Sequence, residues 1–286
     1  MQIYNNEDNR DVLDNNFFIA FDEFNDINRK LFDIPEIDRF LFFSDKKNIC
    51  IQNQSHKGSN FLNRFIPKIC IDYHTSETKR NGGKTQKKRT IIIDAGNGNN
   101  LGYIYLGLVN QAIKKEIDVG NILDKIIIAR AFTFHQLANI LIYELPKITR
   151  EMGNQLQIII VDLFDTLVSS SSLRGIKKHR NNGYSKSNSA LQDNVNIVTE
   201  MIDVLISLSV KYFVILTYND CENIVNSSIT SKFNNAIKVK HFPDSNKNKN
   251  EAFIIELLIH NPRLRNRVNI QQLALIDFDT DLSRET

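Results

Sequence analysis

The sequence contains few cysteines: among 286 residues only Cys50, Cys70 and Cys221 occur. They are odd in number and far apart, and no CxxC pair is present, so neither a disulfide framework nor a zinc site is expected. This cysteine usage favours a reducing compartment inside the cell.

Long hydrophobic runs are also missing. No apolar stretch approaches the roughly 20 residues that a membrane-spanning helix needs, and the first residues, MQIYNNEDNRD, are polar and acidic, unlike a signal peptide. We therefore expect no association with a membrane.

A strong excess of one charge is absent as well. The chain has 36 Lys and Arg against 33 Asp and Glu, a net charge of +3, which argues only weakly for nucleic acid as a partner. The distribution is more informative. Acidic residues crowd positions 7–38, and basic clusters lie at 79–89, 174–186 and 238–267.

One stretch, QLQIIIVDLFDTLVSSSS at 155–172, dominates the hydrophobic pattern. Its apolar run from Leu156 to Val161 is typical of a strand that is buried on both faces of a parallel sheet. The run ends on Asp162. A carboxylate at the carboxyl end of such a strand lies where open α/β sheets bind ligands.

Strand-like and helix-like segments alternate along the rest of the chain, which predicts a doubly wound α/β sheet. We predict strands at 48–52, 90–93, 126–131, 155–161 and 212–217, and helices at 61–73, 101–117, 133–152 and 190–209. Pro67 and Pro146 should shorten or bend their helices, and 121–125 should be a loop. Further strands are predicted at 237–242, 252–259 and 272–278. Residues 1–23 form an extension, and 24–286 form one core domain.

The loop after the first strand, at 53–60, has the position of a phosphate-binding loop but not its composition. Such a loop needs several glycines and a Lys followed by Ser or Thr. Here only Gly58 is present, and Ser59 and Asn60 stand where Lys and Ser or Thr are expected. The Gly82-Gly83-Lys84-Thr85 sequence is not such a loop either, because a strand rather than a helix follows it.

Residues 126–137, IIIARAFTFHQL, closely resemble a strand–helix segment of RadA-type recombinases of the RecA superfamily. Other segments follow in the order of that family over about residues 24–270. The strand ending at Asp94 resembles the one that leads to the catalytic Glu, Gln157–Asp162 resembles Walker B, and Phe213–Asn219 resembles the strand with the γ-phosphate-sensing residue. The resemblance implies a RecA-like fold: a mostly parallel sheet flanked by helices, closed by a C-terminal β-hairpin.

The departures from the family indicate a degenerate nucleotide site. Its positions correspond to Gly58, Ser59, Asn60, Gly96, Asp162 and Asn219, and of the family's catalytic set only Asp162 remains. Phosphoryl transfer needs a positioned Lys, a metal and a residue that aligns water. We therefore expect no ATP hydrolysis, no catalytic residue, and neither ATP nor Mg²⁺ as a cofactor. The chain resembles a non-catalytic paralogue that assists homologous recombination and DNA repair.

Two segments could bind partners of such a paralogue. Recombinases of this kind dock on a neighbouring core through a Phe-x-x-Ala peptide, and Phe17 and Ala20 have that spacing, so a recombinase or a related paralogue is the expected partner. A basic loop with one aromatic residue corresponds to the family's first DNA-binding loop and could contact single-stranded DNA. Its residues are Arg174, Lys177, Lys178, Arg180, Tyr184 and Lys186.

A second interpretation starts from Asp162-Leu163-Phe164-Asp165-Thr166, which resembles the first motif of haloacid-dehalogenase-type phosphatases. Asp162 would be the nucleophile of a Mg²⁺-dependent reaction. Thr217 would supply the second motif, Lys249 the phosphate-neutralising cation, and Asp277 and Asp281 the metal ligands. That family places a second carboxylate two residues after the nucleophile, where this chain has Phe164.

Overall fold

A seven-stranded β-sheet forms the centre of the protein in the computed structural model, which describes residues 48–53, 61–75, 87–96, 100–153, 155–166, 187–219, 232–233, 236–242 and 252–258. The strand order is β3-β2-β4-β5-β1-β6-β7. The strands are β1 (Asn48–Asn53), β2 (Arg89–Asp94), β3 (Ile126–Arg130), β4 (Leu156–Val161), β5 (Phe213–Asn219), β6 (Ala236–Phe242) and β7 (Ala252–Leu258).

Every neighbouring pair from β3 to β6 is parallel, and only β7 runs antiparallel, beside β6. The prediction of a mostly parallel α/β sheet with two antiparallel strands near its C-terminal end is therefore confirmed. The predicted strand at 272–278 lies outside the described residues.

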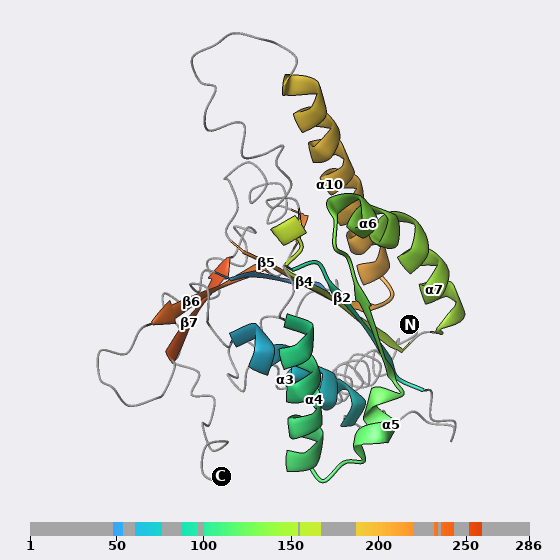
Figure 1. Ribbon diagram of the computed structural model, residues 1–286, viewed down its shortest axis with the longest axis vertical. Coiled ribbons are helices and arrows are strands. Elements are labelled where there is room, and N and C mark those ends of the chain that lie inside the picture. Colours follow the sequence, from blue (N-terminus) through green and yellow to red (C-terminus); the bar gives the residue numbers. More distant parts are fainter. Residues whose placement is uncertain are drawn as a thin grey trace, which may run out of the picture.

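Helices cover both faces of this sheet (Figure 1). One face carries α3 (Phe61–Thr75), α4 (Asn100–Lys114) and α5 (Val119–Leu123). The other carries α10 (Ser187–Ser209) and a continuous helical segment made of α6 (Phe134–Asn139), the π-helix η1 (Ile140–Glu144) and α7 (Leu145–Glu151). No described helix is both long enough and apolar enough to cross a membrane.

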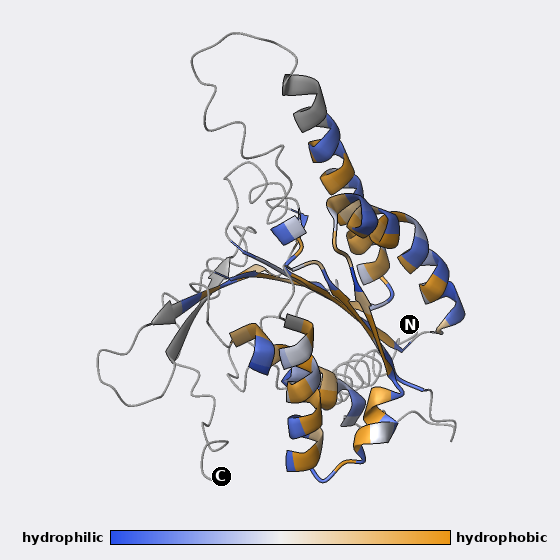
Figure 2. Cartoon of the chain, in the orientation of Figure 1, coloured by the Kyte–Doolittle hydropathy of each residue, from blue (hydrophilic) through white to orange (hydrophobic). Residues whose placement is uncertain are grey.

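The hydrophobic core lies in two layers because successive side chains of a strand point to opposite faces. In β4, Ile159 and Val161 pack into the layer under α3 and α4. Ile158 and Ile160 pack into the layer under α6 and α10. Figure 2 shows the central strands as a mostly hydrophobic band between the helices. This double burial explains why β4 has an unbroken apolar run rather than an alternating one.

The short helix α5 shows that the prediction of a loop at 121–125 was wrong. The Asp118 carboxylate accepts a hydrogen bond from the backbone N–H of Asn121 at 2.6 Å and so caps the helix. Ile122 is buried in the core beneath α4. A five-residue helix is too short to give a periodic pattern, so only its tertiary packing reveals it.

Neither proline ends its helix. Pro67 lies inside α3, which continues to Thr75. Before Pro146 the helix widens to a π-turn, in which the Leu145 N–H donates to the carbonyl of Ile140. A π-turn changes the hydrogen-bond register, which helps a helix to accommodate the missing N–H of a proline.

Pro67 is tolerated partly because Gly107 of α4 faces it. A Cβ atom at Gly107 would lie 2.6 Å from Pro67 Cγ and 3.0 Å from the carbonyl oxygen of Asn63. Pro67 has no N–H to donate to that carbonyl. The absence of a side chain at Gly107 therefore lets the two helices approach closely at this point.

We predict that Gly107→Ala lowers the free energy of unfolding by about 1–3 kcal/mol, because the added methyl group overpacks the α3–α4 contact. Gly102→Ala in the same helix is the matched control, since a Cβ there meets nothing within 4 Å. The control should be neutral or stabilise by up to about 1 kcal/mol, because alanine is the better helix former. Urea denaturation of both variants measures the difference, and equal stabilities would contradict the packing argument.

A chain of buried polar side chains connects α3, β2 and β4 at the amino end of the sheet. The Thr90 hydroxyl donates to Gln157 Oε1 at 3.2 Å, so it accepts from His74 Nε2–H at 3.1 Å. Burial, together with the smaller effects of the Lys125 and Lys88 charges, lowers the pKa of His74 to about 4. His74 is therefore neutral in the folded protein near neutral pH.

We predict that the protein loses stability as pH falls from about 6.5 towards about 4, because the unfolded chain binds a proton at His74 before the folded chain does. His74→Gln should remove this part of the pH dependence. The measurement is the free energy of unfolding at several pH values. His135→Gln serves as the control, since His135 is exposed on α6. A His74→Gln variant with the wild-type pH dependence would contradict the prediction.

Candidate functional site at the carboxyl edge of the sheet

Four neighbouring strands, β2, β4, β5 and β1, end at the same edge of the sheet. In the parallel register Asp94 pairs with Val161, and Asn53 pairs with Asn219. Polar residues cluster at these ends, where open α/β sheets bind ligands. The candidate site comprises Asp94, Asp162, Asp165, Thr217 and Asn219.

Asp94 ends β2 as a fully buried carboxyl group. Its Oδ1 accepts the backbone N–H of Gly96 at 2.9 Å, and its Oδ2 lies 3.9 Å from Arg130 Nε. Burial raises the pKa of Asp94, and the nearby Asp165 charge raises it further, while the Gly96 N–H and Arg130 act in the opposite direction. The Asp94 carboxyl group thus contacts the backbone just after its own strand and the guanidinium of Arg130.

Asp162 follows β4 in a left-handed backbone conformation, with φ of 54°. Its N–H donates to the Thr217 hydroxyl at 3.0 Å, and the next N–H, of Leu163, donates to the Thr217 carbonyl at 3.0 Å. Asp and Asn tolerate this conformation better than most residues. The turn that contains Asp162 is therefore held by hydrogen bonds to Thr217 of β5.

Asp165 and Asn219 meet across the same edge. Asn219 Nδ2 donates to Asp165 Oδ1 at 3.0 Å. Phe164, which precedes Asp165, is almost fully buried, with its ring edge-to-face against Tyr218 at 6.0 Å between centroids. Phe164 is therefore a core residue, and the position where the phosphatase motif needs its second carboxylate points into the hydrophobic layer.

The structure brings together part of the site that the sequence predicted. Gly96, Asp162 and Asn219 lie at one edge, at the ends of β2, β4 and β5. Thr217 of the phosphatase interpretation also contacts Asp162 there. Several predicted positions lie outside the described residues. They are Phe17, Ala20, Gly58, Ser59, Asn60, Arg174, Lys177, Lys178, Arg180, Tyr184, Lys186, Lys249, Asp277 and Asp281.

The sequence analysis did not single out Asp94 or its partner Arg130 as site residues. It also did not predict the contact between Asp165 and Asn219. A signal for Asp94 was present, because it ends an apolar strand in the same way as Asp162. Arg130 lies in the ARAF stretch, directly opposite Asp94 in the β2–β3 register. That pairing depends on which strands are neighbours, which the sequence does not state.

The chemistry available at this edge is limited. Within the described ranges, no group of three or more His, Cys, Asp or Glu side chains is arranged to hold a metal ion. Asn219 is engaged by Asp165, and the Gly96 N–H is turned to Asp94. In the described part of the edge, these strand ends are thus bonded to one another.

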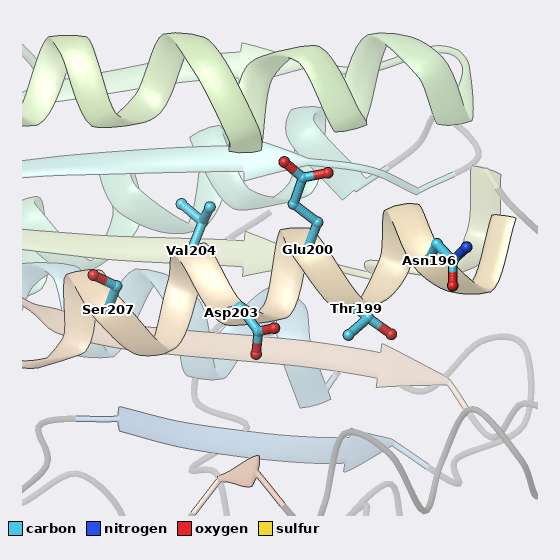
Figure 3. Close-up of a pocket in the computed structure, with 6 residues that line it drawn as sticks. All are labelled: Asn196, Thr199, Glu200, Asp203, Val204 and Ser207. Carbon is cyan, nitrogen blue, oxygen red and sulfur yellow. The ribbon is translucent and has the colours of Figure 1, made fainter. Parts of the chain in front are cut away.

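A separate groove of about 450 Å³ runs along α10 (Figure 3). It is lined by Asn196, Thr199, Glu200, Asp203, Val204 and Ser207. These residues come from one helix, and they point in different directions rather than towards a common centre. Asp203 is paired with Lys232 at 2.5 Å. The groove therefore offers no convergent set of groups, and the carboxyl edge is the better candidate site.

Comparison with protein-family models and with curated proteins finds no match to this chain. The function must therefore be argued from the residues and their geometry.

We predict that Asp162→Asn leaves the free energy of unfolding within about 1 kcal/mol of wild type, because Asn adopts the left-handed conformation readily. Asp162→Val should cost about 1–3 kcal/mol more, since a β-branched residue is strained at positive φ. Chemical denaturation of the two variants checks this. Equal stability of both would show that the turn after β4 relaxes without cost.

Proposed function

We propose that the protein is a RecA-like paralogue without ATPase activity that assists homologous recombination and DNA repair by binding a recombinase or another paralogue, and single-stranded DNA. The observation that carries the proposal is the adjacency of β2, β4, β5 and β1. By the resemblance, these four strands correspond to those that lead to the catalytic Glu, Walker B, the γ-phosphate sensor and the phosphate-binding loop. An ATPase needs all four at one phosphate group, and their carboxyl ends share one edge.

The residues at this edge support the loss of catalysis. Gly96 has no side chain with which to align a water molecule, and its N–H is bonded to Asp94. The amide of Asn219, at the sensor position, is bonded to Asp165. Asp94 contributes a buried carboxyl group, which cannot neutralise the negative charge of a phosphate group. A pocket that has lost these functions can still keep its scaffold for binding other macromolecules.

We predict that calorimetry with Mg-ATP detects no binding tighter than about 1 mM, because the site has lost the Lys and Glu on which the family relies. The protein should also release no phosphate from ATP. Micromolar binding of Mg-ATP that Asp162→Asn weakens would contradict the proposal.

The phosphatase interpretation is favoured by one contact, the Thr217 hydroxyl 3.0 Å from the Asp162 N–H. Against it stands the burial of Phe164. Mg²⁺-dependent hydrolysis of p-nitrophenyl phosphate that is abolished by Asp162→Asn would replace our proposal with this one.

A surface suited to a protein partner lies along β3, the edge strand of the sheet. Ile127 and Ile128 are adjacent residues of β3 and are 40% and 36% exposed, although their side chains point to opposite faces of the sheet. Lysine, proline or a bulge usually protects such an edge. Here the charged residues stand at the two ends, at Lys125 and Arg130, and the stretch between them contains no charged residue and no proline. An exposed apolar edge can accept an extended segment of a partner as an additional strand.

We predict that Ile127→Lys weakens binding to a purified RecA-family recombinase from the same host by at least about tenfold, because a lysine on the edge disfavours strand addition. Phe17→Ala should weaken the same complex if the N-terminal peptide is the aromatic anchor. Val210→Lys is the control, since Val210 is 75% exposed in the turn between α10 and β5. Co-elution on size exclusion measures the complex. Unchanged complexes with both Ile127→Lys and Phe17→Ala would rule out these two surfaces.

A further inference from the structure

An exposed aromatic side chain stands at the end of β3. Phe132 follows the strand by two residues and is 69% exposed, the largest exposed fraction among the aromatic residues that the structure describes. The preceding Ala131 N–H donates to the Asp94 carbonyl at 2.9 Å, which extends the β2–β3 ladder to this point. Phe132 therefore lies at the carboxyl edge of the sheet, close to the candidate site. The exposed Phe132 side chain has no role in the packing of the hydrophobic core.

The backbone beneath this ring is held firmly. The Phe132 N–H donates to Gln136 Oε1 at 3.0 Å, and the Thr133 N–H donates to the same oxygen at 3.2 Å. The Gln136 N–H in turn donates to the Thr133 hydroxyl at 3.2 Å, which completes a capping box. An exposed ring on a fixed backbone loses less conformational entropy on binding than a ring on a flexible loop.

A cation lies against the ring. The guanidinium carbon of Arg130 is 4.7 Å from the centre of the Phe132 ring, within the range of a cation–π contact. Arg130 also lies near a carboxylate, because Asp94 Oδ2 is 3.9 Å from Arg130 Nε, an ion-pair distance that is too long for a hydrogen bond. The result is a planar aromatic group with an adjacent positive charge, both positioned by the β2–β3 edge.

We propose that Phe132 and Arg130 form a platform on which one base of a single-stranded nucleic acid stacks. The inference rests on the single-strand binding in the proposed function and assigns part of it to described residues. A base needs one open aromatic face and gains from a nearby cation. A protein pocket that enclosed Phe132 as an apolar anchor would also desolvate the Arg130 guanidinium beside it, which costs free energy, whereas a stacked base leaves that charge in water. The carboxylates of Asp94 and Asp165 disfavour phosphates here, so the contact is by stacking.

The test is the binding of a fluorescein-labelled single-stranded oligothymidylate by the full chain, measured by anisotropy over a series of salt concentrations. Phe132→Ala should weaken binding about 5- to 100-fold. The slope of log affinity against log salt concentration should stay unchanged, because stacking releases no counterions. Phe132→Tyr should bind within about twofold of wild type, since it keeps the aromatic face. Tyr143→Ala, at a 57% exposed aromatic of η1, is the matched control and should bind as wild type.

A second readout uses the lack of tryptophan in the chain. Phe132→Trp introduces the single tryptophan of the chain, whose emission should be quenched when the oligothymidylate stacks on it. Emission from Tyr143→Trp should stay constant. The platform is overturned if wild type binds the oligonucleotide while Phe132→Ala binds equally well, or if the Phe132→Trp emission does not change.

The platform and the proposed loop contact can be separated. Replacing Lys177, Lys178 and Arg180 together by Ala should reduce the salt dependence, which Phe132→Ala leaves intact. If wild type itself binds no oligothymidylate, both the platform and the single-strand part of the proposed function fall. The recombinase-binding experiment then still decides the rest of the proposed function.

Discussion

The parallel pairing of β2, β4 and β5 in one register is the constraint on which the rest of the structure depends. Aliphatic side chains on both faces of these strands pack into two separate hydrophobic layers. A shift of any of the three strands by one residue would exchange the side chains of the two layers. The pairing continues past the strand ends, where the Ala95 N–H reaches the Val161 carbonyl and the Leu163 N–H reaches the Thr217 carbonyl. The described strand ends at the carboxyl edge are therefore held by the same backbone hydrogen bonding as the sheet.

Rigidity at this edge explains how several polar groups can be buried there. Asp94 is fully buried, and its pKa is raised for that reason, yet a backbone N–H and Arg130 compensate part of the cost. Asp162 has its backbone held by Thr217, and Asp165 is bonded by Asn219. In the proposed function, these contacts among strand ends have taken the place of contacts to nucleotide.

Two features of β3 serve different proposed roles. Its open edge, at Ile127 and Ile128, offers backbone groups and apolar side chains to a partner strand. Its carboxyl end presents the Phe132 ring with Arg130 beside it. The open edge follows from the position of β3 at the side of the sheet. The fixed position of the Phe132 ring follows from the capping box that starts α6. A protein partner and a single strand would therefore meet neighbouring but distinct parts of the same element.

The sequence by itself determined the class of fold, because apolar runs such as Leu156–Val161 and the alternation of strands with helices depend on local side-chain patterns. It also singled out Asp162 and Asn219, since each ends or follows such a run. Only the tertiary structure decided that Asp94 faces Arg130, that Phe164 belongs to the core, and that α5 is a helix. Each of these depends on which distant segments are neighbours, and strand order is set by the packing of the whole sheet rather than by any one segment.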